Sequence, residues 1–329
     1  MKKKKGFKYL LLSMVAIISV SFFGSVPANA GYSDNPNALY YQLSSQVYKV
    51  NGYSSGERSI QNQLTGLYGN KFEVIDSFDS LNNPDHPAGE LNSGLPGYLN
   101  NTGFQAVTVV AERSRKLYIA FAGTNPDSLA DLLTSLNIMQ NDNPGQLYHA
   151  QLYLNYIYNT YPEYRNYKWY FTGHSLGGYI ASKTYLDIRS ANWLNSGPKF
   201  KHGGPVKKTS ISGVYTFNAL PIPKFQVPSV QWNANKNGVY DSAIKNMYIQ
   251  NEWLNGVYDM HYTVMDYFGT KGAINTGIPY YSNISYDKHS DSGYGIVRDL
   301  VGYYSHAKDW KKSVVDSHGI ANFSKWVSN

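Results

Sequence analysis

The run Gly173-His174-Ser175-Leu176-Gly177 has the G-x-S-x-G pattern that can turn a serine into a nucleophile. The residues before it, Lys168 to Thr172, are mostly aromatic and predict a short buried strand, and those from Gly178 to Leu186 have apolar residues at helical spacing. A serine between such a strand and such a helix lies in a sharp turn, the nucleophile elbow, which lifts the serine Oγ above the end of a sheet. The glycines leave room for the crowded backbone. We therefore interpret Ser175 as the nucleophile of an acyl-transfer reaction.

The elements that must position Ser175 alternate between strands and helices along the chain. Apolar and β-branched runs predict strands at 104–111, 117–121, 168–172, 213–218 and 243–250. Amphipathic spacing predicts helices at 37–53, 128–139, 149–159 and 178–186, and the Pro- and Gly-rich stretch 79–102 predicts a long loop. A sheet that alternates with helices and carries a nucleophile elbow at its centre is typical of the α/β-hydrolase fold. The sequence thus predicts an α/β protein with a central, mostly parallel sheet flanked by helices.

Residues 1–30 have the three parts of a secretory signal peptide. Lysines lie at positions 2–5 and 8, an apolar stretch covers 9–23, and Ala28-Asn29-Ala30 matches the A-x-A cleavage signal. The apolar stretch is shorter than the roughly 20 residues that a spanning helix needs, which disfavours an uncleaved membrane anchor. We expect cleavage after Ala30, secretion of the protein, and a single domain over 31–329.

The charge of the chain belongs mainly to this segment. The 29 basic and 22 acidic residues give a net charge of +7, but five lysines and no acidic residue lie in 1–30, so 31–329 keeps 24 basic residues and a net charge of +2. Because 31–329 has no clustered basic stripe, we expect no nucleic-acid partner, and nothing implies a protein partner. The chain has no cysteine, which excludes disulfides and thiol catalysis. We expect neither a metal nor an organic cofactor, since no H-x-x-x-H or C-x-x-C spacing occurs.

Three motifs occur in order around Ser175, namely FAGTN at 121–125, TGHSLGG at 172–178 and YTFNALP at 215–221. Together they resemble the class 3 (fungal-type) lipases, over roughly residues 100–329. With the signal peptide, the resemblance implies a secreted bacterial-type member of that family. In the family, the residue corresponding to Thr124 gives its backbone N–H, and often its hydroxyl, to an oxyanion hole, and the residue corresponding to Leu176 gives a second N–H. The family commonly has arginine where this chain has Ala122, so the usual anchor of this loop is missing.

The resemblance also indicates an acid, which should lie between the serine and the histidine in the chain. The family places its acid just past the strand that corresponds to 243–250, which selects Glu252 and leaves Asp259 and Asp241 as alternatives. The family usually has aspartate there, so glutamate lengthens the arm by one methylene, but Ser-His-Glu triads are chemically sound.

The predicted base is His318. It precedes a predicted closing helix near the C-terminus, which is similar to the position of the family's histidine, whereas His306 and His289 remain alternatives and His261 also follows Glu252. His174, inside the elbow, is expected to pack beneath the nucleophile without transferring a proton.

These residues predict an enzyme that hydrolyses carboxylic esters through Ser175, His318 and Glu252 and an acyl-enzyme. Triacylglycerol or phospholipid is the expected substrate. Residues 126–145 correspond to the segment that acts in the family as a lid over a hydrophobic cleft, and they carry apolar residues at helical spacing. A helix packed on the core is the other interpretation of 126–145. Two other functions could use the same scaffold: an inactive hydrolase that acts as a binding protein, and a serine peptidase or acyltransferase.

Overall fold

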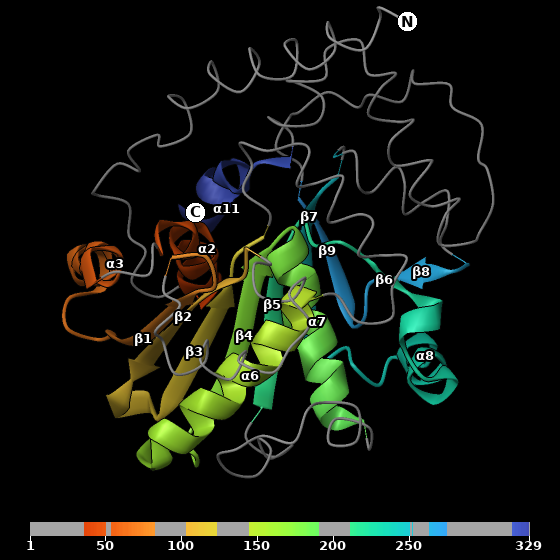
Figure 1. The fold of residues 1–329 in the computed structure, drawn as a ribbon. Coiled ribbons are helices and arrows are strands. Elements are labelled where there is room, and N and C mark those ends of the chain that lie inside the picture. The colour runs from red at the N-terminus through yellow and green to blue at the C-terminus, as the bar shows by residue number, and fades with distance from the viewer. Residues whose placement is uncertain are drawn as a thin grey trace, which may run out of the picture.

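The structure, a computed structural model, describes residues 36–50, 54–82, 103–123, 145–190, 211–250, 252, 263–274 and 318–328. Within these ranges the main sheet has seven strands in the order β1-β2-β3-β4-β5-β7-β9 (Figure 1). Their bounds are Glu73–Asp79 for β1, Gln105–Ala111 for β2, Lys116–Phe121 for β3, Lys168–His174 for β4, Ile211–Phe217 for β5, Ile244–Ile249 for β7 and Thr270–Ile274 for β9. The short strands β6 (Ile222–Pro223) and β8 (Met265–Asp266) form a separate antiparallel pair.

In the main sheet, β3, β4, β5, β7 and β9 run parallel to one another, whereas β2 runs antiparallel to both β1 and β3. The predicted α/β-hydrolase fold is therefore confirmed, with a mostly parallel sheet and the elbow serine directly after its central strand, β4.

Helices cover both faces of the sheet (Figure 1). The helices are α2 (Pro36–Gln46), α3 (Ser54–Tyr68), α6 (Gly145–Thr160), α7 (Leu176–Arg189), α8 (Ser229–Lys236) and α11 (Ser324–Ser328). Short 3-10 turns occupy Val47–Lys49, Glu112–Ser114, Pro162–Tyr164, Lys224–Gln226 and Ile320–Phe323. Side chains of α6 and α7 pack on one face, and those of α2, α3 and α11 pack on the other.

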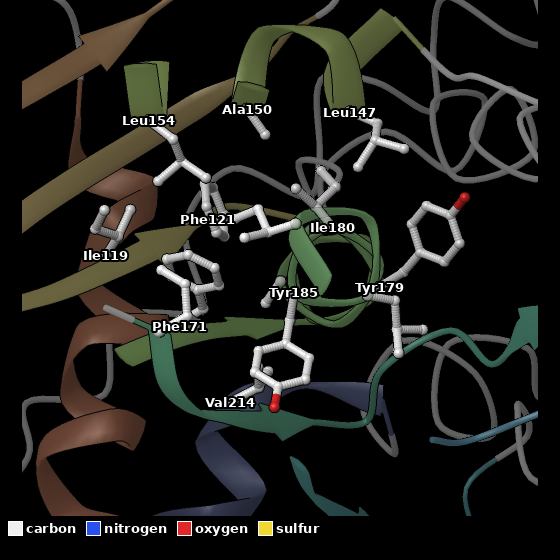
Figure 2. Close-up of a cluster of buried hydrophobic side chains, with 14 of the residues drawn as sticks. Ile119, Phe121, Leu147, Ala150, Leu154, Phe171, Tyr179, Ile180, Tyr185 and Val214 are labelled. Carbon is white, nitrogen blue, oxygen red and sulfur yellow. The ribbon is translucent and has the colours of Figure 1, made fainter. Parts of the chain in front are cut away.

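Strand β3 shows how the sequence forms this layered core. Its residues Leu117, Ile119 and Phe121 belong to the cluster under α6 and α7, and the alternate residues Tyr118 and Ala120 belong to the cluster on the other face. Successive side chains of a strand point to opposite faces, so a strand that is apolar at every position is buried on both sides. Figure 2 shows the first cluster, in which Phe121 and Phe171 of the sheet face side chains of α6 and α7.

The parallel strands bring four segments of the chain to one edge of the sheet. Strands β3, β4, β5 and β7 end at Phe121, His174, Phe217 and Ile249, respectively. The carboxyl ends of parallel strands meet at the same edge, which is where open α/β sheets bind their ligands. The three sequence motifs and Glu252 all lie at or directly after these strand ends.

Several elements were not predicted from the sequence. Strand β1 was missed because Asp76 and Asp79 make it look polar, although both side chains are buried and accept hydrogen bonds, from Tyr161 Oη at 3.2 Å and from Gln105 Nε2 at 3.0 Å. Helix α3 was missed because its buried residues recur only every fourth position, at 56, 60, 64 and 68, in an otherwise polar stretch. The predicted helix 37–53 ends early, since α2 stops at Gln46 and the 3-10 turn after it stops at Lys49.

Other predictions lie wholly or partly outside the described residues. These are the signal peptide of 1–30, the single domain over 31–329, most of the long loop 79–102 and the helix 128–139, which stay predictions. Across the described ranges, no helix combines the length and the apolar character that crossing a membrane would require.

Candidate active site

Ser175 lies in a tight turn between β4 and α7. Its backbone angles are φ 57° and ψ −126°, a conformation that is strained for a residue with a side chain. The Ser175 N–H donates to the carbonyl of Phe217 at 3.0 Å, and the Ser175 carbonyl accepts from the N–H of Gly178 at 3.0 Å. These contacts tie the turn to the end of β5 and to the first turn of α7.

The glycines of the motif allow this turn to form. A Cβ on Gly173 would collide with the backbone of Gly177, and a Cβ on Gly177 would collide with the carbonyl of Phe121 at the end of β3. A Cβ on Gly178 would lie 2.7 Å from the Cβ of Ala219. Residues without side chains are therefore needed at all three positions for α7 to pack this close to the ends of the strands.

The structure brings the predicted acid and base together. His318 Nδ1 lies 2.7 Å from Glu252 Oε1, and the side chain of Glu252 has no exposed surface. A carboxylate removed from water needs such a partner, and a carboxylate on Nδ1 fixes the tautomer of the imidazole so that Nε2 can take a proton. Glu252 follows the end of β7, and its N–H donates to the carbonyl of Ile249 at 3.1 Å.

His174 links the His318 main chain to the elbow. Its Nε2 lies 2.8 Å from the carbonyl oxygen of His318, and the centroids of the two rings are 4.8 Å apart. Burial lowers the pKa of His174 to about 3, with a further lowering from His318 that outweighs the opposite effect of the hydrogen bond to the His318 carbonyl. His174 is therefore neutral at ordinary pH. This agrees with the expectation that His174 transfers no proton.

Asn218 also holds the His318 carbonyl. Its Nδ2 donates to that oxygen at 3.1 Å, and its Oδ1 accepts from the N–H of Ile249 at 2.9 Å. Asn218 follows the end of β5 and has a positive φ of 41°. One side chain thus connects the ends of β5 and β7 to the residue that is predicted as the base.

The loop after β3 packs directly on the nucleophile. A Cβ on Gly123 would lie 3.2 Å from Ser175 Cβ and 2.6 Å from the carbonyl oxygen of His174. The Gly123 N–H donates to Tyr48 Oη at 3.1 Å, and Tyr48 Oη lies 3.2 Å from His174 Nδ1. Burial raises the pKa of the Tyr48 hydroxyl, with the Gly123 hydrogen bond as a smaller opposing effect, so this hydroxyl stays protonated.

Of the two predicted oxyanion donors, the structure describes Leu176 but not Thr124. Leu176 is the first residue of α7, and the first N–H groups of a helix have no carbonyl partner within that helix. Thr124 lies outside the described residues, one position beyond Gly123. Ala122 is buried in the core between the sheet and α2, a site that its small apolar side chain fits.

The alternative acids and bases are only partly described. Asp241 is exposed and precedes β7, so it lies at the amino end of the strand whose carboxyl end leads to Glu252. Asp259, His261, His289 and His306 lie outside the described residues, as does the proposed lid except for Gly145, which begins α6. Within the described ranges, no group of three or more His, Asp or Glu side chains could hold a metal ion.

Two residues of this network were not singled out from the sequence. Tyr48 contacts Gly123 and His174 across 75 and 126 residues of sequence, and Asn218 contacts His318 across 100. No local spacing signals contacts of this range. For Asn218, its place at the end of a predicted strand, within one of the three motifs, was the available signal.

No family model matches this sequence, and a comparison with curated proteins finds no relative. Solved structures of fungal lipases are similar to the chain at low identity. Lipase II from Rhizopus niveus has 13% identity and a TM-score of 0.42, and the match covers 72% of this chain and 81% of that one. The triacylglyceride lipase of Rhizomucor miehei has 14% identity and a TM-score of 0.41, with 72% and 79% covered, and Lip2 lipase from Yarrowia lipolytica has 14% and 0.40, with 72% and 76% covered. The strand order and the turn at Ser175, rather than these likenesses, define the fold of this chain as that of an α/β-hydrolase.

Proposed function

We propose that this protein is a secreted serine hydrolase that cleaves carboxylic esters of lipids. The observation that carries the proposal is the 2.7 Å contact between His318 Nδ1 and the buried Glu252 carboxylate, at the edge of the sheet where Ser175 lies in its strained turn. A buried carboxylate on one nitrogen of a histidine, beside a serine in an elbow, is the arrangement that activates a serine hydroxyl.

In the proposed reaction, Ser175 Oγ attacks the ester carbonyl while His318 Nε2 takes its proton. The C–O bond of the tetrahedral intermediate then breaks, His318 returns the proton to the leaving alcohol, and the acyl group stays on Ser175. Water, deprotonated by His318, then attacks this acyl-enzyme, and His318 returns that proton to Ser175 Oγ as the bond to the acyl group breaks and the carboxylic acid leaves. Glu252 stabilises the imidazolium that forms in each step.

The N–H groups of Leu176 and Thr124 are the proposed donors to the oxyanion. Support for Leu176 comes from its place at the start of α7, where the N–H groups and the helix dipole both favour negative charge. Support for Thr124 comes from the packing of the preceding residue, Gly123, against Ser175 Cβ. Loss of one such donor costs on the order of 3 kcal/mol of transition-state stabilisation.

The lipid substrate is the finer part of the proposal. It is supported by the resemblance of the three motifs to class 3 lipases and by the apolar residues of 126–145. These are Leu129, Leu132, Leu133, Leu136, Ile138 and Met139. An amphipathic helix can bury its apolar face in a lipid surface, and such binding would give a lipid substrate access to a cleft that the helix otherwise covers.

The test is hydrolysis of p-nitrophenyl butyrate, octanoate and palmitate by residues 31–329, with and without lipid micelles. We expect turnover that the Ser175→Ala variant lacks, and covalent labelling of Ser175 by a fluorophosphonate. The Ser182→Ala variant is the matched control, because Ser182 Oγ is buried in α7 without a hydrogen-bond partner among the described residues. We expect it to keep full activity.

The outcomes separate the three functions. Higher turnover of long chains on micelles would support a lipase, and equal turnover without micelles would leave an esterase of short esters. Labelling of Ser175 together with cleavage of amides, or with transfer of the acyl group to an alcohol, would favour a peptidase or an acyltransferase. Neither turnover nor labelling in the wild type would contradict the proposal and indicate an inactive scaffold.

A further inference from the structure

We propose that Tyr48 and His174 form a relay of hydrogen bonds. The relay positions the predicted base, His318, and the loop after β3 that contains Gly123 (the oxyanion loop) relative to each other and to Ser175. Tyr48 lies in the 3-10 turn that follows α2, and His174 is the last residue of β4. The inference rests on the proposed function, because the relay positions groups that act only in that reaction. Neither residue touches the substrate in this proposal, so both are positioning residues.

The direction of each hydrogen bond follows from the chemistry of the groups. The His318 carbonyl can only accept, so His174 Nε2 carries a proton and donates it across 2.8 Å. His174 is neutral, since burial lowers its pKa to about 3, and its other nitrogen, Nδ1, is therefore an acceptor. The Gly123 N–H can only donate, so Tyr48 Oη accepts from it at 3.1 Å and donates its own proton to His174 Nδ1 at 3.2 Å. All three bonds thus point from the oxyanion loop toward the base.

The first end of the relay fixes the oxyanion loop. A Cβ on Gly123 would lie 2.7 Å from Tyr48 Oη and 3.2 Å from Ser175 Cβ, so the loop lies between the tyrosine and the nucleophile. Since the Gly123 N–H is bonded to Tyr48, it cannot also bind an oxyanion. In this proposal, therefore, a later residue of the loop donates to the oxyanion, and Thr124 remains the predicted donor.

The second end of the relay fixes the main chain of the base. Two donors, His174 Nε2 and Asn218 Nδ2, share the His318 carbonyl at 2.8 and 3.1 Å. Glu252 holds the side chain of the same residue at Nδ1. The backbone and the ring of His318 are therefore held independently, and Nε2 is the ring nitrogen proposed to transfer the proton.

These bonds are partly buried. His174 is only 6% exposed and Asn218 only 1% exposed, whereas Tyr48 is half-buried. A buried polar group that loses its hydrogen bond has little solvent to replace the partner. Removal of the Tyr48 hydroxyl would leave both the Gly123 N–H and His174 Nδ1 without this partner. Each end of the relay could then shift, and displacements of about 1 Å at a catalytic group can cost on the order of 100-fold in rate.

The experiment compares Tyr48→Phe with Tyr153→Phe. Tyr153 is fully buried, and its hydroxyl is bonded to Thr108 Oγ1 at 2.8 Å, but it lies on α6 against β2, away from the site. For Tyr48→Phe we expect kcat on p-nitrophenyl butyrate and the rate of fluorophosphonate labelling to fall about 10- to 100-fold, with KM changed less than about twofold. For Tyr153→Phe we expect kcat within about twofold of the wild type. The midpoint of thermal unfolding should shift by a similar amount in Tyr153→Phe and Tyr48→Phe.

A second measurement does not depend on activity. The ¹⁵N shifts of the His174 ring, from pH 5 to 8, should report a protonated Nε2 and an unprotonated Nδ1 in the wild type. In Tyr48→Phe the Nδ1 shift should move toward that of a nitrogen without a hydrogen bond. The His174→Gln variant keeps an amide donor near the position of Nε2, so it should retain more activity than His174→Leu.

Failure of the relay and failure of the proposed function look different. If the wild type turns over esters and Tyr48→Phe is as active as Tyr153→Phe, the relay is wrong and the hydrolase stands. A proton on Nδ1 of His174 would overturn the relay in the same way. If the wild type neither turns over esters nor reacts with the fluorophosphonate, both the proposed function and the positioning role of the relay are wrong.

Discussion

At the scale of residues, strain is concentrated at the candidate site. Among the described residues, three that are not glycine have a positive φ: Arg115, Ser175 and Asn218. Ser175 and Asn218 follow directly on the carboxyl ends of β4 and β5, and Arg115 lies in the turn between β2 and β3. Such conformations cost on the order of 1–3 kcal/mol each and persist where the surroundings force them. At Ser175 and Asn218 the surroundings are the hydrogen bonds that tie the strand ends together.

Replacement of Glu252 tests the acid. Glu252→Gln keeps the shape of the side chain but replaces the carboxylate that contacts His318 Nδ1 with a neutral amide. We therefore expect kcat/KM for ester hydrolysis to fall about 10³- to 10⁴-fold. Asp241→Asn is the control, because Asp241 is exposed at the amino end of β7 and should not affect activity. The measurement is kcat/KM on p-nitrophenyl butyrate. If Glu252→Gln kept the wild-type kcat/KM, or if Asp241→Asn lowered kcat/KM strongly, the acid would be a residue other than Glu252.

The sequence predicts residues of the site unequally. Ser175 follows from a local pattern, because the elbow is built from residues that are adjacent in the chain, whereas the role of Leu176 came from the resemblance. Glu252 and His318 were reached only through the resemblance, since their 2.7 Å contact joins residues 66 apart in sequence. Tyr48 carries no local signal at all, because its role depends on how α2 and its 3-10 turn pack against the sheet.

At the scale of elements, the junction of β4 and α7 is the most tightly packed feature of the site. Gly177 lies in the first turn of α7 against the carbonyl of Phe121, whereas Gly66 lies in α3 with no atom within 4 Å of where a Cβ would be. The same substitution should therefore have opposite effects at the two positions. The contrast separates the need for close packing from the general preference of helices for alanine.

Gly177→Ala should lower the free energy of unfolding by about 1–3 kcal/mol, because the added Cβ forces α7 away from β3. Gly66→Ala should raise it by about 0.4–1 kcal/mol, because alanine loses less backbone entropy in a helix. Urea unfolding of both variants measures these changes. Equal effects of the two substitutions would mean that α7 can move without cost.

The elements themselves were predicted where apolar residues dominate. Strands β2, β3, β4, β5 and β7 were predicted to within two residues at their ends, because most of their residues are apolar or aromatic and buried or half-buried. Strand β1 lies at the edge of the sheet, and its buried aspartates are explained only by distant partners such as Tyr161. Strand β9 has only five residues, Thr270–Ile274, which is too short for a clear alternation.

At the scale of the whole molecule, burial of histidine makes stability depend on pH. His149 has no exposed surface and packs against the rings of Phe78 and Phe104, and this burial lowers its pKa from 6.5 to about 4. Above pH 6.5 the residue is neutral in both the folded and unfolded states. As the pH falls from 6.5 to 4, only the unfolded state gains the proton, so the fold loses stability over this window.

The loss from His149 is about 3 kcal/mol at pH 4. Thermal or urea unfolding at pH 8, 6.5, 5 and 4 should show it as a difference between the wild type and His149→Leu, whose stability should fall less over the same range. Other titrating groups are common to both proteins and cancel in this difference. Parallel curves for the two proteins would mean that His149 takes up its proton in the folded state.

The contacts of His174 also have a consequence for when the protein can first act. His318 bonds to His174 across 144 residues of sequence, and Glu252 lies between them. A ribosome that adds roughly 5–20 residues per second needs about 7–30 s to reach His318 after it has made Ser175. During that interval the growing chain holds Ser175 without His318, and every strand of the main sheet up to β9 is made before the base. If Ser175 and His318 act as proposed, a growing chain therefore gains hydrolytic activity only after the strands of the described sheet have been synthesised.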